Sequence, residues 1–119
     1  MDKNNELVQL NYDLLNDYIQ SLGVEVVNKM IALYREQVVI YLVEIERALQ
    51  CHDAGLWQEH CHKMKGAAGS IGLKSLHAQL VIMEKTTADI TEKAQLLVEL
   101  KVHNKQALTN VNAWLEQHR

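Results

Sequence analysis

The chain has 119 residues, which is enough for one domain with a buried core and too few for two. Hydrophobic residues make up 48% of it, which argues against disorder, and no apolar run approaches the roughly 20 residues of a transmembrane helix. Fifteen acidic and twelve basic residues give a formal charge of −3 without a Lys/Arg cluster, so we expect no nucleic-acid partner. The polar N-terminus is no signal peptide, and two cysteines without a disulfide framework fit a reducing cytoplasm.

The first half of the chain predicts a short helix followed by a long one. Asn11 is the expected N-cap of a helix over 12–22, and Gly23 is its C-terminal cap. A second helix over 24–50 follows because apolar residues recur every three or four positions, the period of an amphipathic helix. These residues are Val27, Met30, Ile31, Tyr34, Val38, Tyr41, Leu42, Ile45 and Leu49. Residues 1–10 are expected to be a flexible or extended N-terminus.

Three more helices are expected in the second half. Asp53 is the expected N-cap of a helix over about 56–71, and a tight connection at Gly72 leads into another over 74–86. The segment from Asp89 to Glu92 resembles a capping box that opens a last helix over 90–117. Brief turns between the helices predict a single all-α domain, an antiparallel up-down four-helix bundle with a short additional N-terminal helix.

The helix over 56–71 has an apolar half and a polar half, and His62 lies at the middle of the polar half. Lys65 lies beside His62 on the helical wheel, and Gly66 and Gly69 lie where side chains would otherwise crowd it. Glycine inside a helix costs about 0.8–1 kcal/mol relative to alanine, so two glycines flanking an exposed histidine need a reason. Close approach of another macromolecule supplies one. We expect its docking surface to comprise Gln58, Glu59, Gly66 and Gly69.

Phosphoryl transfer explains these residue types. A neutral imidazole nitrogen is a nucleophile near pH 7, and Lys65 can stabilise the charge of a phosphoryl group one helical turn away. The chain has no Gly-rich nucleotide loop, so we do not expect an autonomous enzyme that binds ATP. No cofactor of its own is expected, because an acceptor aspartate and its Mg²⁺ would come from the partner.

The segment from His62 to Leu73, HKMKGAAGSIGL, resembles the His-x-x-Lys-Gly signature of histidine-containing phosphotransfer (HPt) domains. It is similar in particular to the C-terminal HPt domains of tripartite hybrid sensor kinases, such as the anaerobic-respiration and trimethylamine-N-oxide sensors. The resemblance implies that His62 is phosphorylated and that Lys65 and Gly66 are its flanking partners. It also implies that Glu84, on the following helix, holds the position where the family often has Glu or Gln near the active imidazole.

A phosphorelay role in two-component signalling follows from this resemblance. His62 would accept a phosphoryl group from a receiver-domain aspartate of a hybrid sensor kinase and pass it to the aspartate of a response regulator. We expect a monomer without direct membrane contact, either cytoplasmic on its own or the cytoplasmic C-terminal domain of an inner-membrane sensor kinase.

Two other readings remain open from the residues alone. Five potential metal ligands lie close in sequence, namely Cys51, His52, His60, Cys61 and His62. However, His60 and His62 are about 200° apart on one helix, and no C-x-x-C or H-x-x-x-H spacing is present, so no metal site is expected. The second alternative is a helical protein–protein adaptor without phosphotransfer chemistry. The remaining histidines, His52, His77, His103 and His118, are expected to be surface residues without a chemical role.

Overall fold

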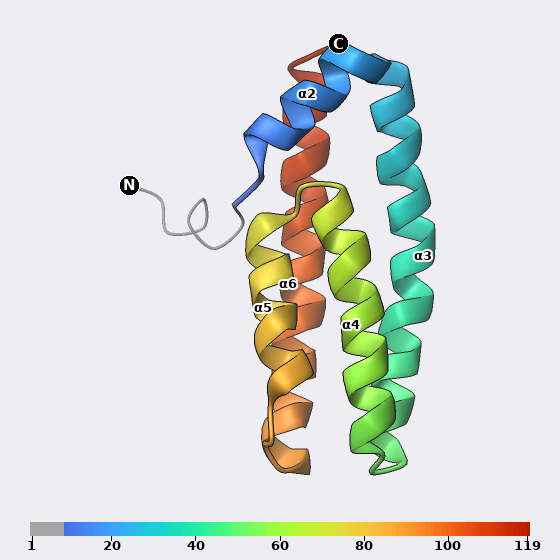
Figure 1. The fold of residues 1–119 in the computed structure, drawn as a ribbon, viewed down its shortest axis with the longest axis vertical. Helices are drawn as coiled ribbons and strands as arrows, with labels where there is room; N and C mark the ends of the chain where they lie inside the picture. Colours follow the sequence, from blue (N-terminus) through green and yellow to red (C-terminus); the bar gives the residue numbers. More distant parts are fainter. Residues whose placement is uncertain (1–8) are drawn as a thin grey trace.

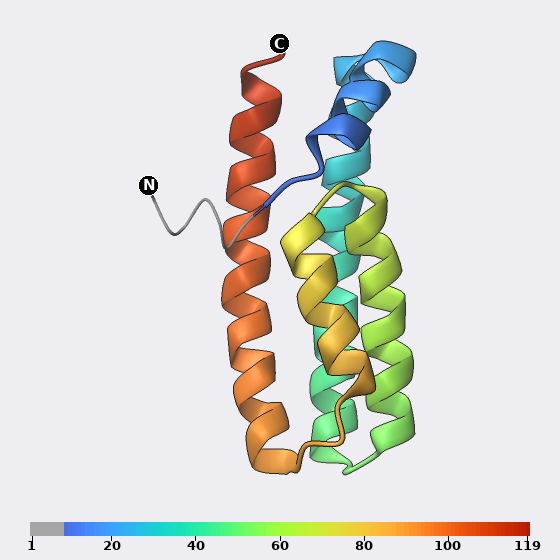
Figure 2. The ribbon, with the colours of Figure 1, turned by 60° about the vertical axis from the view of Figure 1, so that its left-hand side comes forward.

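The computed structural model describes residues 9–119, which form five α-helices. These are α2 (Tyr12–Leu22), α3 (Val24–Gln50), α4 (Ala54–Ser70), α5 (Lys74–Lys85) and α6 (Ile90–Glu116). Helices α3 to α6 run alternately up and down beside one another, and the short α2 lies across one end of the bundle (Figure 1). The turned view shows α5 as the shortest of the four bundle helices (Figure 2). The expected all-α fold with a short additional N-terminal helix is therefore confirmed.

Side-chain caps set where three of the described helices begin, namely α2, α4 and α6. The Asp53 Oδ1 atom accepts a hydrogen bond from the Leu56 backbone N–H at 3.0 Å, and Asp89 caps α6 in the same way. The first two helices have the predicted bounds, but α4 begins at Ala54, two residues earlier than expected. The cap was identified correctly. The early start follows from it, because the first helical residue comes directly after the N-cap.

The core lies between the four bundle helices, α3 to α6. One side of α4 is fully buried in it through Trp57, Cys61, Met64 and Ala68. Since these residues recur at helical spacing, the opposite side of α4 must face outward. The packing of α4 between α3 and α5 thus fixes which of its side chains reach the surface. Within the described residues, no helix combines the length and apolar composition that a membrane crossing requires.

A buried polar contact joins α3 to α6 inside this apolar core. The Tyr34 hydroxyl donates a hydrogen bond to the Asn104 Oδ1 atom at 2.7 Å, and both residues are buried. Burial raises the pKa of the Tyr34 hydroxyl, which therefore stays protonated and keeps its donor.

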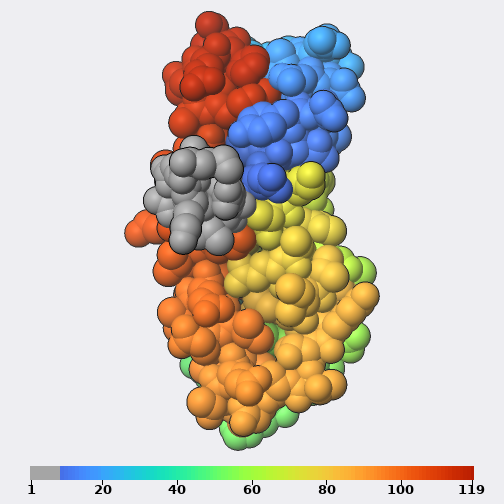
Figure 3. Space-filling model, turned by 90° about the vertical axis from the view of Figure 1, so that its left-hand side faces the viewer, coloured from blue at the N-terminus to red at the C-terminus, as the bar shows by residue number. Residues whose placement is uncertain are grey.

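The turn between α4 and α5 packs against the residues that precede α2. The Asn11 backbone N–H donates to the Gly72 carbonyl at 2.8 Å, and the Gln9 N–H donates to the Ser75 hydroxyl at 2.9 Å. Gly72 has a φ of +75°, and a Cβ there would lie 2.9 Å from the Leu15 Cγ atom, so only glycine fits. The helix that follows these N-terminal residues, α2, lies beside the C-terminal part of α6 (Figure 3). The expectation for the N-terminus falls largely on residues 1–8, which lie outside the described residues.

Candidate functional site

His62 lies near the middle of α4 on its outward side, as predicted, and its side chain is 65% exposed. Its Nδ1 atom is 2.5 Å from the Oε1 atom of Glu84, which projects from α5. A carboxylate can only accept here, so Nδ1 carries a proton, and in the neutral imidazole Nε2 keeps its lone pair. Nε2 has no hydrogen-bond partner among the described residues. The imidazole is therefore held in one tautomer with its nucleophilic nitrogen unblocked.

Lys65 shares the same carboxylate. Its Nζ atom is 2.6 Å from the Oε2 atom of Glu84, so this one side chain bridges His62 and Lys65. The hydrogen bond from Lys65, helped by that from His62, holds the pKa of Glu84 below its ordinary value, against the opposing effect of desolvation. The side chain of Lys65 is only 21% exposed, because it is ion-paired with Glu84. The Glu84 carboxylate on α5 holds the Lys65 side chain at the line of contact between α4 and α5, which we call the α4–α5 seam.

Three of the four expected docking residues lie in the open. Gln58 and Glu59 are exposed on α4, one turn before His62. A Cβ built at Gly66 would meet nothing within 4 Å. We call Gln58, Glu59, His62 and Gly66 the His62 face. It leaves room for a second macromolecule to approach the imidazole.

Gly69 does not belong to this open face. A Cβ at Gly69 would lie 2.9 Å from the Cδ2 atom of His77 on α5, so the glycine makes room for that ring. The expectation that Gly69 is open is wrong because the tight turn at Gly72 brings α4 and α5 close together at this end. His77, expected to be a plain surface residue, is half-buried against Gly69.

Other histidines also have structural partners. His103 is half-buried rather than on the open surface, with its Nδ1 atom 2.5 Å from the Gln79 Oε1 atom and its Nε2 atom 3.1 Å from the Ser75 hydroxyl. His60 points toward Glu44 of α3, with 3.9 Å between its Nε2 atom and the carboxylate. Sequence periodicity could not reveal these contacts, because each depends on how a second helix packs.

The possible metal ligands are not brought together. Cys61 is completely buried, and burial raises the pKa of its thiol to about 12, so the thiol stays protonated at neutral pH. Among residues 9–119, no three His, Cys, Asp or Glu side chains are grouped so that they could hold an ion. Cys51 and His52 are exposed in the loop between α3 and α4. His62 lies about two helical turns further along, within α4.

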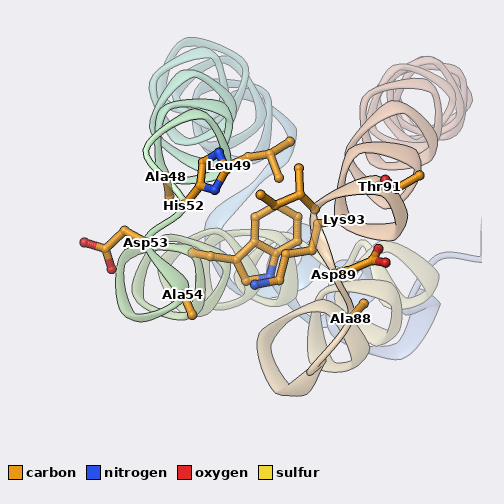
Figure 4. A pocket seen from close by; sticks show the side chains of 11 residues that line it. Ala48, Leu49, His52, Asp53, Ala54, Ala88, Asp89, Thr91 and Lys93 are labelled. Atoms are coloured by element: carbon orange, nitrogen blue, oxygen red, sulfur yellow. The ribbon is translucent and has the colours of Figure 1, made fainter.

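A pocket of about 420 Å³ lies at the end of the bundle where α4 and α6 begin (Figure 4). Its charged side chains already have structural roles. Asp53 and Asp89 cap the two helices, and the Lys93 Nζ atom is 5.3 Å from the centre of the Trp57 ring. His62 does not line this pocket. The arrangement suited to nucleophilic chemistry is therefore the open His62 face.

Comparisons with known proteins agree with this geometry. Residues 29–115 match the family model described as the Hpt domain. The aerobic respiration control sensor protein ArcB of Escherichia coli is 31% identical over 67 residues, and so is ArcB of Shigella flexneri. In both cases the match covers 56% of this chain and 9% of the sensor, so the chain spans a small part of these relatives.

Two solved structures share the fold. A structure of the histidine-containing phosphotransfer domain of E. coli ArcB superposes with a TM-score of 0.84 at 23% identity, over 97% of this chain and 98% of that one. A solution structure of the same domain gives a TM-score of 0.82 at 22% identity, over 99% and 98%. The resemblance to the trimethylamine-N-oxide type stays an expectation. The family match includes His62, Lys65 and Glu84 and covers most of the bundle, so the chain belongs to the family of Hpt domains.

Proposed function

We propose that this chain is a phosphorelay intermediate that accepts a phosphoryl group from a receiver aspartate on His62 and passes it to the aspartate of a response regulator. The observation that supports it best is the exposed imidazole whose Nδ1 atom is bonded to Glu84 while Nε2 is unblocked. The family match makes this the expected chemistry for such a histidine.

The transfer step needs no proton to move. The Nε2 lone pair attacks phosphorus, the bond from phosphorus to the aspartyl oxygen breaks, and the receiver leaves as a carboxylate. The ring then bears positive charge, and the Glu84 carboxylate stabilises it through the Nδ1–H hydrogen bond. Transfer to the second receiver is the reverse step, in which the electrons of the N–P bond return to Nε2.

Lys65 supplies positive charge close to this step. Its ammonium group is bonded to the Glu84 carboxylate, which also binds His62. The positive charge is therefore held within one helical turn of the phosphoryl position. Mg²⁺ and the acceptor aspartate are expected from the receiver. The role of the chain is positioning and charge stabilisation, which is how most phosphoryl transfer is catalysed, so we do not propose an autonomous enzyme.

The His62 face is the proposed contact surface for receivers. Gln58, Glu59 and Gly66 surround the imidazole without covering it. We propose that the domain acts as a monomer on the cytoplasmic side, either alone or as part of a hybrid sensor kinase. The alternative, a helical adaptor, has less support because mere binding does not require a histidine and a lysine bonded to one carboxylate.

The test is transfer from a receiver domain phosphorylated with acetyl phosphate. We expect an acid-labile, base-stable label on His62 alone, mapped by mass spectrometry under alkaline conditions. His62→Gln should abolish labelling, whereas His52→Gln, which removes an exposed histidine at the α3–α4 turn, should not. Label on another histidine contradicts the proposal. Binding of receivers without any label would favour the adaptor.

A further inference from the structure

Charge is unevenly divided between the helices. Residues 54–85, which hold α4 and α5, contain four lysines and two glutamates, a formal charge of +2. The rest of the chain contains eight basic and thirteen acidic residues, a formal charge of −5, which accounts for the total of −3. The helices that bear His62 and Glu84 are thus positive in a protein that is otherwise acidic.

Three of these lysines are open to solvent. Lys63, Lys74 and Lys85 are exposed, and none of them forms an ion pair with a described residue. Lys63 directly follows His62. Lys74 and Lys85 are three turns apart, about 16 Å, and they lie on the same side of α5. This side is opposite the buried positions of α5, which are Leu76, Leu80 and Met83.

The two glutamates of this segment offset little of that charge. Glu84 is already engaged by Lys65 and His62, so it does not neutralise the outward lysines. Glu59 is exposed on the His62 face and is the one acidic side chain of α4. The exposed charge of these two helices is therefore mainly positive, from Lys63 next to His62 and from Lys74 and Lys85 along α5.

We propose that Lys63, Lys74 and Lys85 form an electrostatic docking surface that steers receivers with an acidic phosphorylation site toward His62. This inference rests on the proposed function. A receiver needs an aspartate as phosphoryl carrier and carboxylates to hold Mg²⁺, and a phosphoryl group adds about −1.5 to −2 charges. Complementary charge raises the rate of encounter and is screened by salt. It also disfavours encounters through the acidic remainder of this chain.

The test compares two charge reversals of equal size. K74E/K85E reverses the outward charges of α5, and K29E/K105E reverses two exposed lysines on α3 and α6 that lack described ion-pair partners. Both are made in the His62→Gln background, so that binding is measured without chemistry. The probe is the receiver domain of the same organism that phosphorylates the wild-type chain fastest. Association rates are measured by stopped flow at about 20 mM and about 500 mM salt.

We expect K74E/K85E to slow association about tenfold at low salt and less than about twofold at high salt. The reason is that the distance over which salt screens charges falls from about 30 Å at 0.01 M to about 3 Å at 1 M. The control should change association by less than about twofold. Equal slowing by both variants, or no slowing by K74E/K85E, would overturn the docking surface. If no receiver labels His62 in the wild-type chain, the proposed function fails instead. Melting temperatures of all variants establish that the bundle is intact.

Discussion

Glu84 is the residue on which the geometry of the site depends. Its two oxygen atoms hold His62 and Lys65 at the same time, although these residues lie one turn apart on another helix. The carboxylate therefore fixes a tautomer through one oxygen and a positive charge through the other. Replacing any member of this trio should change the other two.

Lys65→Ala should slow transfer to His62 by about tenfold or more, about 1.4 kcal/mol of barrier, because a cation near the transferring group is lost. The free energy of unfolding should also fall modestly, because the loss of the half-buried Lys65 side chain leaves Glu84 with His62 as its remaining partner. Single-turnover transfer kinetics and thermal melts measure the two effects. Lys63→Ala, which removes an exposed neighbouring lysine that has no ion pair with a described residue, is the control for stability. Unchanged transfer by Lys65→Ala would make Lys65 purely structural.

The lowered pKa of Glu84 predicts a pH-dependent contribution to stability. Its carboxylate titrates lower in the folded chain than in the unfolded one. The contribution is therefore complete above the ordinary pKa of about 4.3, and it is lost as the pH falls through the folded value. The difference in unfolding free energy between wild type and Glu84→Gln should therefore narrow as the pH falls below about 4. Urea denaturation across this range measures the difference, and a difference independent of pH would contradict the ion pair between Glu84 and Lys65.

The sequence was enough to predict that His62 faces outward, because the angle of a side chain about its own helix follows from periodicity. The contacts of Gly69, His77 and His103 could not be predicted in this way. Each depends on the distance to a second helix, which the angle does not contain. The link between Lys65 and Glu84 was missed for the same reason, although the family resemblance placed Glu84 near the imidazole.

At the scale of helices, the seam between α4 and α5 depends on Gly69. His62 faces Glu84 at one layer of the seam, and Gly69 faces His77 seven residues further along α4 and seven residues back on α5. The antiparallel register is therefore constant across two turns. The glycine at the second layer admits the imidazole ring that a larger residue would displace.

Gly69→Leu should destabilise the bundle by about 1–3 kcal/mol through overpacking against His77. Adding His77→Ala should restore part of the loss, because the ring that the leucine meets is then absent. Gly66→Leu is the matched control. It places the same side chain in open space, so stability should hold while transfer slows by obstruction of the His62 face. Urea denaturation of the four proteins measures this, and a Gly69→Leu protein as stable as wild type would contradict the seam.

For the whole molecule, the sequence predicted the number, order and approximate bounds of the helices, because caps and apolar periodicity act locally. It did not predict how α3 and α6 are aligned with each other. The buried hydrogen bond from Tyr34 to Asn104 connects residues 70 positions apart. Tyr34 was expected among the apolar stripe of its helix, but its hydroxyl has a specific partner that only the packed bundle shows.

Tyr34→Phe should lower the unfolding free energy by about 1–3 kcal/mol, because it leaves the buried Asn104 oxygen without its donor. Tyr41→Phe is the control on the same helix, since the Tyr41 hydroxyl has no hydrogen bond among the described residues and is only partly buried. The double variant Tyr34→Phe/Asn104→Leu removes both polar partners, so its stability should recover toward that of wild type. Transfer to His62 should be unchanged in all of these proteins, because the contact joins α3 to α6 and the site lies on α4 and α5. Equal losses in Tyr34→Phe and Tyr41→Phe would mean that this hydrogen bond does not stabilise the bundle.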